Sequence, residues 1–468
     1  MRSLLIKPAF GLKGEINFSG DKSIAHRSII FSSLAPGKTI IENFPTNKDC
    51  QQTLTVFKKL GIKIRQKSTR RGCQIIAVFG KGMQGLKKPK TAIFVGDSGT
   101  TLRLLLGVLA GQNFETKLIA GKSLSQRPML RVTEPLRMMG AKIYGQMGHL
   151  PALSVRQAGG RQEWANGQRE EYPPIIINGG NLKAITYRMP VASAQVKSAI
   201  LLAGLYARGK TRLIEPIKTR DHAERMLKLF KAGIKVQQNS IVIKGGQELV
   251  SPGKITIPGD ISSASFFLAL ASLLPNARLR IRKVSLNPSR YGAIRVLKRM
   301  GADIRVTGYA LPAGRQGLRV TNYEPMGDII VKSSILKGTV VKKEEIPSLI
   351  DELPILMVAA SLAKGRTVFE GVGELRVKET DRIRSMSENL KKMGAIIQIN
   401  RTAKAENIIV KGVKLLKGAK VKSFGDHRTA MSMVVAGLKA QGKTLIDDIS
   451  CINKSFPHFL ALLKPLIK

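Results

Sequence analysis

A dense group of charged residues stands at positions 376–382, in the order Arg-Val-Lys-Glu-Thr-Asp-Arg, and a run typical of a helix follows from 383 to 393. In a confined site, the Lys378 ammonium could hold a ligand anion or the Glu379 carboxylate while Glu379 gains and loses a proton. Arg382, three residues later, would lie on the same helical face and bind a phosphate or carboxylate through two hydrogen bonds. The chemistry indicated is proton transfer beside an anionic substrate.

The same run also has a purely structural interpretation. Glu379 and Asp381 would sit in the first turn of a helix, where carboxylates favour the positive end of the helix dipole. Charge runs are also most often solvated faces. The run alone leaves both interpretations open, so the elements that position it have to be considered.

The chain has 468 residues, 43% hydrophobic and 5% aromatic, which predicts a globular protein of two or three domains. The longest apolar runs, such as 199–207, are too short to span a bilayer, and no signal peptide is recognised. Cys50, Cys73 and Cys451 are scattered without ligand spacing, so neither a disulfide framework nor a zinc site is expected. We expect a cytoplasmic protein without a membrane partner.

The net charge is +47, from 78 Lys and Arg residues against 31 Asp and Glu residues. Such a charge predicts affinity for anions: nucleic acid, acidic lipid or phosphorylated metabolites. The basic residues are spread over the whole chain, however, and form no stripe with aromatic stacking platforms. Specific nucleic-acid binding is therefore not expected, although a basic nucleic-acid-binding protein stays open as an alternative of another class.

A polar segment followed by an Ala/Leu-rich helix recurs six times, at intervals of about 70 to 95 residues. The segments start at Gly20, Gly96, Ala192, Gly259, Ile350 and Gly425. Five units also show a helix that ends in a Gly between apolar residues, namely Gly61, Gly140, Gly233, Gly301 and Gly394. The pattern therefore predicts that each unit has two helices interleaved with short strands.

Six α/β units favour two domains of three units each, related by duplication. Gly20-Asp21 and Pro258-Gly259-Asp260 are similar in sequence and mark the expected crossovers. Residues 21–258 would then form one domain, and residues 1–20 with 259–468 the other. Surface insertions are expected at 157–174, which contains Trp164, and at 312–317.

The polar segments place helix N-termini, which attract anions, next to basic residues. The basic residues near them are Lys22, Arg27, Arg103, Arg127, Arg220 and Arg428. This pattern suits substrates with several phosphate and carboxylate groups. The histidines lack metal-ligand spacing, the chain has no Gly-x-Ser-x-Gly elbow, and its glycine motifs lack the Lys of a P-loop. A metal site, a hydrolase and nucleotide hydrolysis are therefore not expected.

Three segments together resemble the 5-enolpyruvylshikimate-3-phosphate (EPSP) synthase family, the 3-phosphoshikimate 1-carboxyvinyltransferases. They are the charged run at 376–382, Val-Ala-Ser-Ala-Gln-Val-Lys-Ser-Ala at 191–199 and Gly-Asp-His-Arg-Thr-Ala-Met at 425–431. The resemblance extends from Lys22 to Phe456. It implies a mixed α/β fold of two inside-out α/β barrels, as in enolpyruvyl transferases, each with three βαβαββ repeats, that close on a cleft.

The resemblance also implies a reaction of the shikimate pathway to chorismate and the aromatic amino acids. The 5-hydroxyl of shikimate 3-phosphate attacks C2 of phosphoenolpyruvate, C3 is protonated, and phosphate leaves the tetrahedral intermediate. No cofactor or metal is implied, since Arg, Lys and helix termini stabilise the charges. The expected partners are these two small molecules, and the expected state is a monomer.

Motif by motif, the resemblance assigns Lys22, Asp351, Lys378 and Glu379 to catalysis. Asp351 would take the proton of the 5-hydroxyl, with Lys378 beside it, and Glu379 would deliver a proton to C3. Shikimate 3-phosphate would be bound by Lys22, Ser23, Arg27, Ser193, Gln195, Arg220, Asp351 and Lys378. Phosphoenolpyruvate, whose site glyphosate occupies in this family, would be bound by Lys22, Gly99, Arg127, Gln195, Arg382, Arg428 and Lys454.

The sequence leaves open the role of Asp97 and the distinction from one related family. The family usually has Asn where Asp97 stands, so a carboxylate would face an anionic substrate unless nearby cations offset it or Asp97 turns away to cap its helix. The related family is that of UDP-N-acetylglucosamine enolpyruvyl transferase, which has the same fold and chemistry. Its mobile loop typically carries a reactive Cys, whereas residues 121–127 contain none here.

Overall fold

The computed structural model describes residues 2–69, 72–149, 169–307, 323–402 and 405–467. The expected insertion at 312–317 and residues 157–168, with Trp164, lie outside these ranges. Residues 169–174, expected to end the first insertion, belong instead to strand β9 (Arg169–Asn178), which pairs antiparallel with β8 (Lys142–His149). That end of the expected insertion is therefore part of a sheet.

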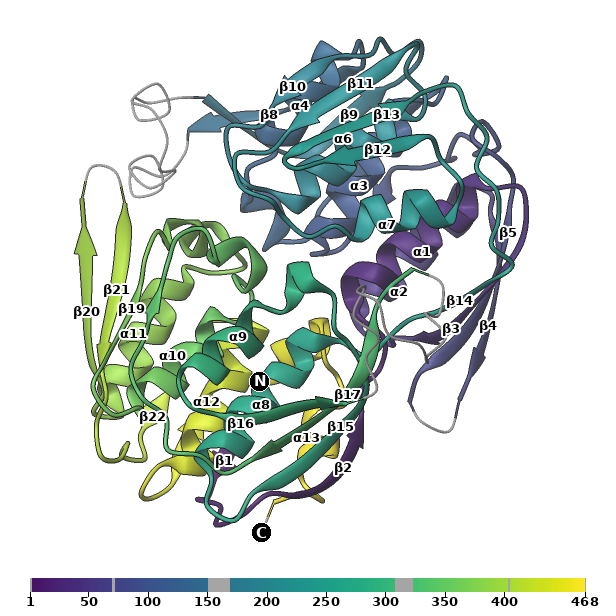
Figure 1. Ribbon diagram of the computed structural model, residues 1–468. Coiled ribbons are helices and arrows are strands. Elements are labelled where there is room, and N and C mark those ends of the chain that lie inside the picture. Colours follow the sequence, from purple (N-terminus) through teal and green to yellow (C-terminus); the bar gives the residue numbers. More distant parts are fainter. Residues whose placement is uncertain (1, 70–71, 150–168, 308–322, 403–404, 468) are drawn as a thin grey trace.

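A six-element unit repeats along the first part of the chain: strand, helix, strand, helix and an antiparallel strand pair (Figure 1). The first unit comprises β2 (Lys13–Asn17), α1 (Lys22–Leu34), β3 (Gly37–Phe44), α2 (Lys48–Lys59), β4 (Lys63–Ser68) and β5 (Gln74–Gly80). The second comprises β6 (Ile93–Phe94), α3 (Gly99–Leu109), β7 (Glu115–Ile119), α4 (Leu130–Met138), β8 and β9. The third comprises β10 (Thr186–Arg188), α6 (Ala194–Gly204), β11 (Lys210–Ile214), α7 (His222–Leu229), β12 (Ile234–Gln237) and β13 (Ser240–Lys244).

The later part of the chain repeats this order. The fourth unit comprises β14 (Lys254–Thr256), α8 (Ile261–Leu273), β15 (Arg278–Ser285), α9 (Gly292–Arg299), β16 (Asp303–Thr307) and β17 (Met326–Lys332). The fifth comprises β18 (Val340–Val341), α10 (Leu353–Ser361), β19 (Arg366–Phe369), α11 (Arg382–Lys392), β20 (Ile396–Arg401) and β21 (Glu406–Lys411). The sixth comprises β22 (Lys420–Val421), α12 (His427–Lys439), β23 (Thr444–Ile446) and α13 (Phe459–Leu463), and β1 (Leu4–Ile6) completes its sheet. The expected six units are confirmed within the described ranges.

The two helices of a unit differ in how they are buried. The first helices are buried on nearly all sides, and in α8 every residue is buried, as expected of a helix enclosed by other elements. The second helices, such as α9 and α11, bury one face and expose Lys and Arg on the other. The helices α8, α10 and α12 pack on one another. The N-termini of the first helices are therefore held in place by a packed core.

Most of the expected helix ends are confirmed, with one correction. Asp21, Ser98, Ser193, Asp260 and Asp426 cap their helices by accepting hydrogen bonds from backbone N–H groups. Gly61, Gly140, Gly301 and Gly394 have the positive φ of a helix stop. Gly233 does not, because α7 ends earlier and Lys231 takes the left-handed position with φ of 59°.

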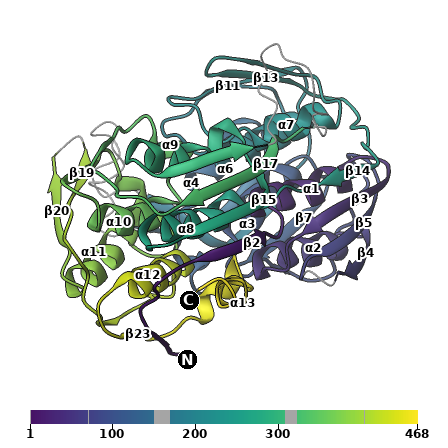
Figure 2. The ribbon, with the colours of Figure 1, turned by 60° about the horizontal axis from the view of Figure 1, so that its bottom comes forward.

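Two strands are exchanged between the early and late units. In the other units the first strand pairs parallel with the strand after its helix, as β6 does with β7. β2 instead pairs parallel with β15, and β14 pairs parallel with β3. Figures 1 and 2 both show the purple β2 beside the green β15. The chain crosses at Gly20 and Gly259, which form an antiparallel bridge with each other.

The described residues bury their apolar side chains in two clusters. One contains residues between Ile24 and Ile257, and the other combines Ile6 to Phe18 with Ile261 to Leu466. We call the surrounding parts the central half (residues 21–258) and the terminal half (residues 1–20 and 259–468). That these halves are separate domains with the expected boundaries stays a prediction.

Candidate active site

The polar starts of the six buried helices meet at a cleft of about 530 Å³ between the two halves. Each helix brings at least one residue at its start to the lining: Lys22, Thr100, Ser193, Ser262, Asp351 and Arg428. Because helix N-termini carry unpaired amides and a partial positive charge, their convergence makes the cleft a binding site for anions.

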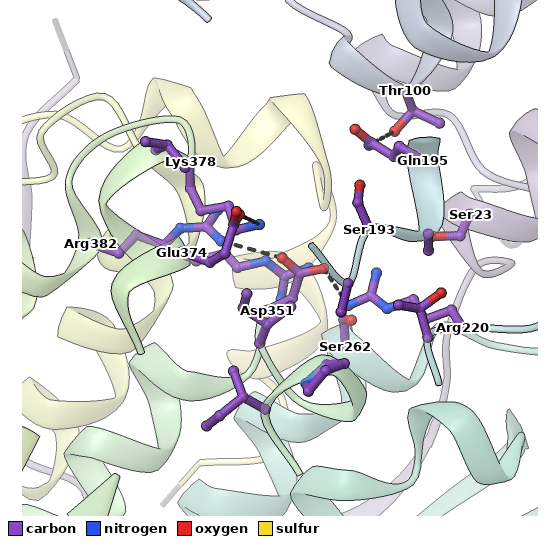
Figure 3. Close-up of a pocket in the computed structure, with 18 of the residues that line it drawn as sticks. Ser23, Thr100, Ser193, Gln195, Arg220, Ser262, Asp351, Glu374, Lys378 and Arg382 are labelled. Carbon is purple, nitrogen blue, oxygen red and sulfur yellow. Dashed lines mark hydrogen bonds and ion pairs between the residues drawn. The ribbon is translucent and has the colours of Figure 1, made fainter. Parts of the chain in front are cut away.

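Most of the expected site residues line this cleft. They are Lys22, Ser23, Arg27, Arg127, Ser193, Gln195, Arg220, Asp351, Lys378, Glu379, Arg382 and Arg428. Figure 3 shows Ser23, Ser193, Gln195 and Arg220 facing Asp351, Lys378 and Arg382 from the opposite side. Gly99 and Lys454 are not in the lining and are described below.

The charged run at 376–382 separates into two groups with different tasks. Arg376 binds Glu406, with Nε 2.8 Å from Oε2, and Asp381, with Nη1 2.5 Å from Oδ2. Asp381 also caps α11 by accepting a hydrogen bond from the backbone of Arg384. Arg376 and Asp381 therefore brace the segment. Glu379 precedes α11 rather than sharing a helical face with Arg382, so that part of the expectation is wrong.

Asp351 is held by arginines from both halves. Its Oδ2 lies 2.6 Å from Arg220 Nη2 and 3.9 Å from Arg428 Nη2, and its Oδ1 lies 3.3 Å from Arg382 Nη1. Burial would raise the pKa of the Asp351 carboxyl, but Arg220, Arg428 and Arg382 hold that pKa well below its ordinary value. Asp351 is therefore an anion surrounded by cations.

Glu379 has a similar environment. Its Oε2 lies 2.6 Å from Arg382 Nη2, and its Oε1 lies 3.6 Å from Arg127 Nη1 in the central half. Burial would raise the pKa of the Glu379 carboxyl, but Arg382 and Arg127 keep that pKa well below its ordinary value. His427 nearby is neutral, because burial lowers its pKa to about 3.

Arg382 joins the carboxylates of the terminal half. Its side chain is 1% exposed and contacts Asp351, Glu379 and Asp426, whose Oδ2 lies 2.8 Å from Arg382 Nε. These three anions outweigh burial and raise the pKa of Arg382. A permanent cation thus fixes both candidate proton-transfer carboxylates relative to each other.

The structure adds lining residues that the sequence did not single out. Arg131 Nη1 lies 3.2 Å from Glu374 Oε1 across the cleft, and Lys378 Nζ lies 3.6 Å from Glu374 Oε2. Arg127 is extended and α4 begins only at Leu130, so the four-residue spacing from Arg127 to Arg131 is not a helical one and the sequence offers no clear signal for Arg131.

Arg103, which the sequence marks only as a basic residue beside a helix start, is part of the cleft lining. Its Nη1 donates to Gln195 Oε1 at 2.6 Å, and burial beside Arg127 and Arg131 lowers its pKa. Lys22 forms an ion pair with Asp49 of α2, and although burial would lower the pKa of Lys22, Asp49 raises it.

Gly99 lies directly behind the lining. A Cβ at this position would lie 2.9 Å from Arg127 Nη1 and 3.1 Å from Arg103 Nη1, so the absence of a side chain lets both guanidinium groups approach α3. Ser98, not Gly99, caps that helix.

Asp97 turns away from the centre of the cleft, but it does not cap its own helix. Its Oδ1 accepts from the backbone N–H groups of Ser123 and Leu124, at 3.0 and 3.2 Å. Its Oδ2 lies 3.7 Å from Lys454 Nζ of the terminal half. Asp97 therefore holds the turn that leads to Arg127, and Lys454 contacts this carboxylate.

The described residues contain neither a candidate metal cluster nor a candidate membrane span. No group of three or more His, Cys, Asp or Glu side chains in these ranges is arranged to hold a metal ion. In the same part of the chain, no helix combines the length and the apolar character needed to cross a membrane.

Comparison with known proteins gives a consistent result. A family model described as EPSP synthase (3-phosphoshikimate 1-carboxyvinyltransferase) matches residues 6–167 and 156–463. Proteins named 3-phosphoshikimate 1-carboxyvinyltransferase are similar over nearly their whole length. The one from Bacillus licheniformis is 43% identical over 97% of both chains, and the one from Thermodesulfovibrio yellowstonii is 44% identical over 99% of both.

Solved structures agree with these matches. EPSP synthase from Acinetobacter baumannii superposes with a TM-score of 0.80 and 39% identity, covering 100% of this chain and 98% of that one. The enolpyruvyl transferase NikO from Streptomyces tendae superposes with a TM-score of 0.72 at 16% identity, with the same coverage, and so shares the fold. The expected enolpyruvyl transferase-like α/β fold is confirmed.

Proposed function

The chain belongs to the EPSP synthase (3-phosphoshikimate 1-carboxyvinyltransferase) family, and we propose how its cleft performs the reaction of that family. The enzyme transfers the enolpyruvyl group of phosphoenolpyruvate to the 5-hydroxyl of shikimate 3-phosphate and releases phosphate, in the shikimate pathway. The observation that carries the proposal is the set of arginine–carboxylate pairs across the cleft.

Shikimate 3-phosphate binds among Lys22, Ser23, Arg27 and Arg220, with Ser193 and Gln195 at the start of α6. Its phosphate competes with Asp351 for Arg220, whose Nη2 lies 2.6 Å from Asp351 Oδ2 in the ligand-free protein. Losing that cation raises the pKa of Asp351 from its depressed value. Asp351 then becomes a better base and takes the proton of the 5-hydroxyl as its oxygen attacks C2 of phosphoenolpyruvate.

Phosphoenolpyruvate binds near Arg127, Arg382 and Arg428, with Lys454 at the edge of the cleft. In the ligand-free protein Glu379 is ionised and therefore has no proton to give. When the anionic groups of phosphoenolpyruvate neutralise Arg127 and Arg382, the pKa of Glu379 rises, so Glu379 can take up a proton and deliver it to C3. The tetrahedral intermediate then expels phosphate as C3 returns a proton to the Glu379 carboxylate.

The two halves of the chain act as closing domains with the expected boundaries, residues 21–258 and residues 1–20 with 259–468. Neither half alone supplies the groups for both substrates, and a single chain lines the whole cleft. We further propose that the enzyme works as a monomer in the cytoplasm on small-molecule substrates, without a nucleic-acid or membrane partner. Shikimate 3-phosphate should compact the protein and raise its melting temperature. Scattering profiles that superimpose with and without saturating ligand would contradict closure.

A phosphate-release assay with two acceptors tests the reaction. Phosphoenolpyruvate with shikimate 3-phosphate should give stoichiometric phosphate, and phosphoenolpyruvate with UDP-N-acetylglucosamine should give none. A thiol-alkylating reagent should leave turnover intact, because residues 121–127 contain no Cys, Cys50 and Cys451 are buried, and the partly exposed Cys73 does not line the cleft. Turnover only with the UDP-sugar would contradict the proposal.

A further inference from the structure

Helix α6 contains a lysine at a position where the surrounding helix is apolar. Lys197 is completely buried, between buried Val196 and Ser198, and the helix continues as Ala199, Ile200 and further apolar residues. Burying an ammonium group costs free energy that pairing seldom recovers in full, so an apolar residue would serve packing as well. Lys197 therefore needs a reason beyond the core.

The contacts of Lys197 join the two ends of a loop. Its Nζ lies 3.1 Å from Glu215 Oε2, at the end of β11, and 2.6 Å from Glu224 Oε1, in the first turn of α7. Both carboxylates are buried, with side chains 2% and 4% exposed. The loop between these two anchors, residues 216–221, carries Arg220.

The same network reaches the backbone next to Arg220. Glu215 Oε1 accepts hydrogen bonds from the backbone N–H of Thr219, at 3.1 Å, and from its hydroxyl. Lys197 Nζ lies 3.5 Å from the carbonyl oxygen of Thr219. The residue before Arg220 is thus held at its N–H, its carbonyl and its side chain.

The next residue of α6 holds a second arginine of the site. Ser198 Oγ accepts a hydrogen bond from Arg27 Nη2 at 2.6 Å and donates to the carbonyl oxygen of Ala194 at 2.6 Å. Arg27 is also fixed to its own helix, because Nη1 donates to the carbonyl oxygen of Ser23 at 2.9 Å. The second turn of α6 therefore contacts the supports of both arginines, while its first turn brings Ser193 and Gln195 to the cleft.

We propose that Lys197 and Ser198 are positioning residues for shikimate 3-phosphate: Lys197 fixes the loop that presents Arg220, and Ser198 fixes Arg27. The inference rests on the proposed function, in which Arg220 and Arg27 bind this substrate. The expected effect is selective for shikimate 3-phosphate, because the side chains of Lys197 and Ser198 bind Glu215, Glu224 and Arg27 and not Arg127, Arg382, Arg428 or Lys454, which are assigned to phosphoenolpyruvate alone. Loss of Lys197 should weaken shikimate 3-phosphate binding far more than phosphoenolpyruvate binding.

Three variants and a control test the proposal in the full-length enzyme. Lys197→Met removes the ammonium, Glu224→Gln removes one partner's charge, and Ser198→Ala removes the support of Arg27. Glu171→Gln is the control: Glu171 is a buried carboxylate of the same half that pairs with Arg137 away from the cleft. Steady-state kinetics with each substrate varied at saturation of the other, and calorimetric titration with shikimate 3-phosphate alone, are the readouts.

Lys197→Met should raise the KM and the Kd for shikimate 3-phosphate about tenfold, the scale of losing a charged hydrogen bond. The KM for phosphoenolpyruvate should change less than about twofold. Glu224→Gln and Ser198→Ala should shift the same constants in the same direction by smaller factors, and Glu171→Gln should leave them unchanged. If Lys197→Met does not fold, Glu224→Gln and Ser198→Ala decide the matter.

Other outcomes overturn the proposal. Unchanged binding of shikimate 3-phosphate in the folded variants would show that the network only supports the core. An equal rise in both KM values, or a matching rise in Glu171→Gln, would indicate general loosening of the central half. Wild-type enzyme that binds shikimate 3-phosphate but releases no phosphate would contradict the proposed function instead, and the calorimetric comparison would still decide the roles of Lys197 and Ser198.

Discussion

The central half and the terminal half repeat one structural unit, yet they bring different charges to the cleft. In the ion pairs that join Arg127 to Glu379, Arg131 to Glu374 and Arg220 to Asp351, the central half supplies the arginine and the terminal half the carboxylate. The terminal half also supplies its own cations, such as Arg382. The repeated unit explains why the helix N-termini converge on the cleft. The side chains that differ between the two halves explain why arginines face carboxylates across it.

This difference means that carboxylates of the terminal half hold arginines of the central half in the ligand-free protein. Arg127, Arg131 and Arg220 are each already paired with a carboxylate, so they are oriented before an anionic substrate arrives. In the proposed mechanism the substrates take over the arginines that pair with Asp351 and Glu379, so that the lowered pKa of each carboxyl rises when it has to move a proton. Predictions that alter one side of a pair therefore test the comparison directly.

The largest effect is expected at Glu379. Glu379→Gln keeps the shape of the side chain and removes the transferable proton, so turnover should fall by about two or more orders of magnitude. Shikimate 3-phosphate should still bind, because its arginines are untouched. Steady-state kinetics and titration calorimetry measure the two quantities. Glu374→Gln, which also alters a pair across the cleft, is the control and should retain much more activity. Near-normal turnover of Glu379→Gln would remove Glu379 from the mechanism.

The next effect concerns equivalent helix caps at the two crossovers. Burial disfavours both anions, but Arg290, with Nη1 3.4 Å from Asp21 Oδ2, helps to lower the pKa of Asp21 to about 2. Burial and the repulsion of Asp21 raise the pKa of Asp260 to about 6. The Asp21 charge therefore stabilises the fold above pH 4, and this contribution is lost as pH falls toward 2. The Asp260 charge costs stability that grows as pH rises from 4 to 6.

Replacing each cap with Asn keeps the acceptor for the helix and removes the charge. At pH 8 Asp260→Asn should raise the free energy of unfolding on the order of 2 kcal/mol. Asp21→Asn should lower it by a smaller amount, because the change also removes the repulsion that Asp260 experiences. At pH 4 the gain from Asp260→Asn should be nearly gone. Denaturant unfolding at both pH values measures these changes. Shifts of equal sign at pH 8 would show that the two crossovers are not electrostatically different.

The sequence predicted much of this arrangement because its signals are local. Helix caps such as Ser98 and stops such as Gly61 depend on near neighbours, and six repeats of them indicate the unit. The exchange of β2 and β14 has no local signal, since a strand carries no mark of its partner. The prediction that Gly233 ends its helix was wrong for a related reason. A helix stop of this kind needs a residue with positive φ, and here Lys231 adopts that conformation although it is not Gly.

Within the site, the motif residues were predicted and their supports were not. Asp351 and Arg382 stand in recognisable segments, but Arg131 and Glu374 become neighbours only when the halves meet. The orientation of Asp97 depends likewise on a turn about 26 residues later, with which its carboxylate forms hydrogen bonds. Contacts between side chains that are distant in the sequence form only when the chain folds, so no local sequence signal predicts them.

A smaller effect is expected at Gly99, behind the central arginines. The Cβ of Gly99→Ala would lie 2.9 Å from Arg127 Nη1, so the guanidinium group has to shift by a few tenths of an ångström. The KM for phosphoenolpyruvate should rise by up to about tenfold, the value of one displaced charged contact. Glyphosate should inhibit the wild type competitively with phosphoenolpyruvate and inhibit the variant less. A wild type that ignores millimolar-scale glyphosate while binding phosphoenolpyruvate normally would contradict this placement of Gly99.

The smallest effect is expected where the charges across the cleft are reversed, at Asp97 in the central half and Lys454 in the terminal half. Their charged atoms are 3.7 Å apart and their side chains are 30% and 28% exposed, so the pair contributes at most about 1 kcal/mol. Asp97→Asn keeps the oxygen that accepts from Ser123 and Leu124, removes a negative charge and releases Lys454.

The KM for phosphoenolpyruvate should therefore fall about two- to threefold in Asp97→Asn, and the difference from wild type should shrink at high salt. A double-mutant cycle with Lys454→Met separates the two contributions, because Asp97→Asn should have little further effect once Lys454 is gone. A KM that rises instead would show that the charge of Asp97 is needed to hold the turn before Arg127, so that here a central carboxylate supports substrate binding rather than opposing it.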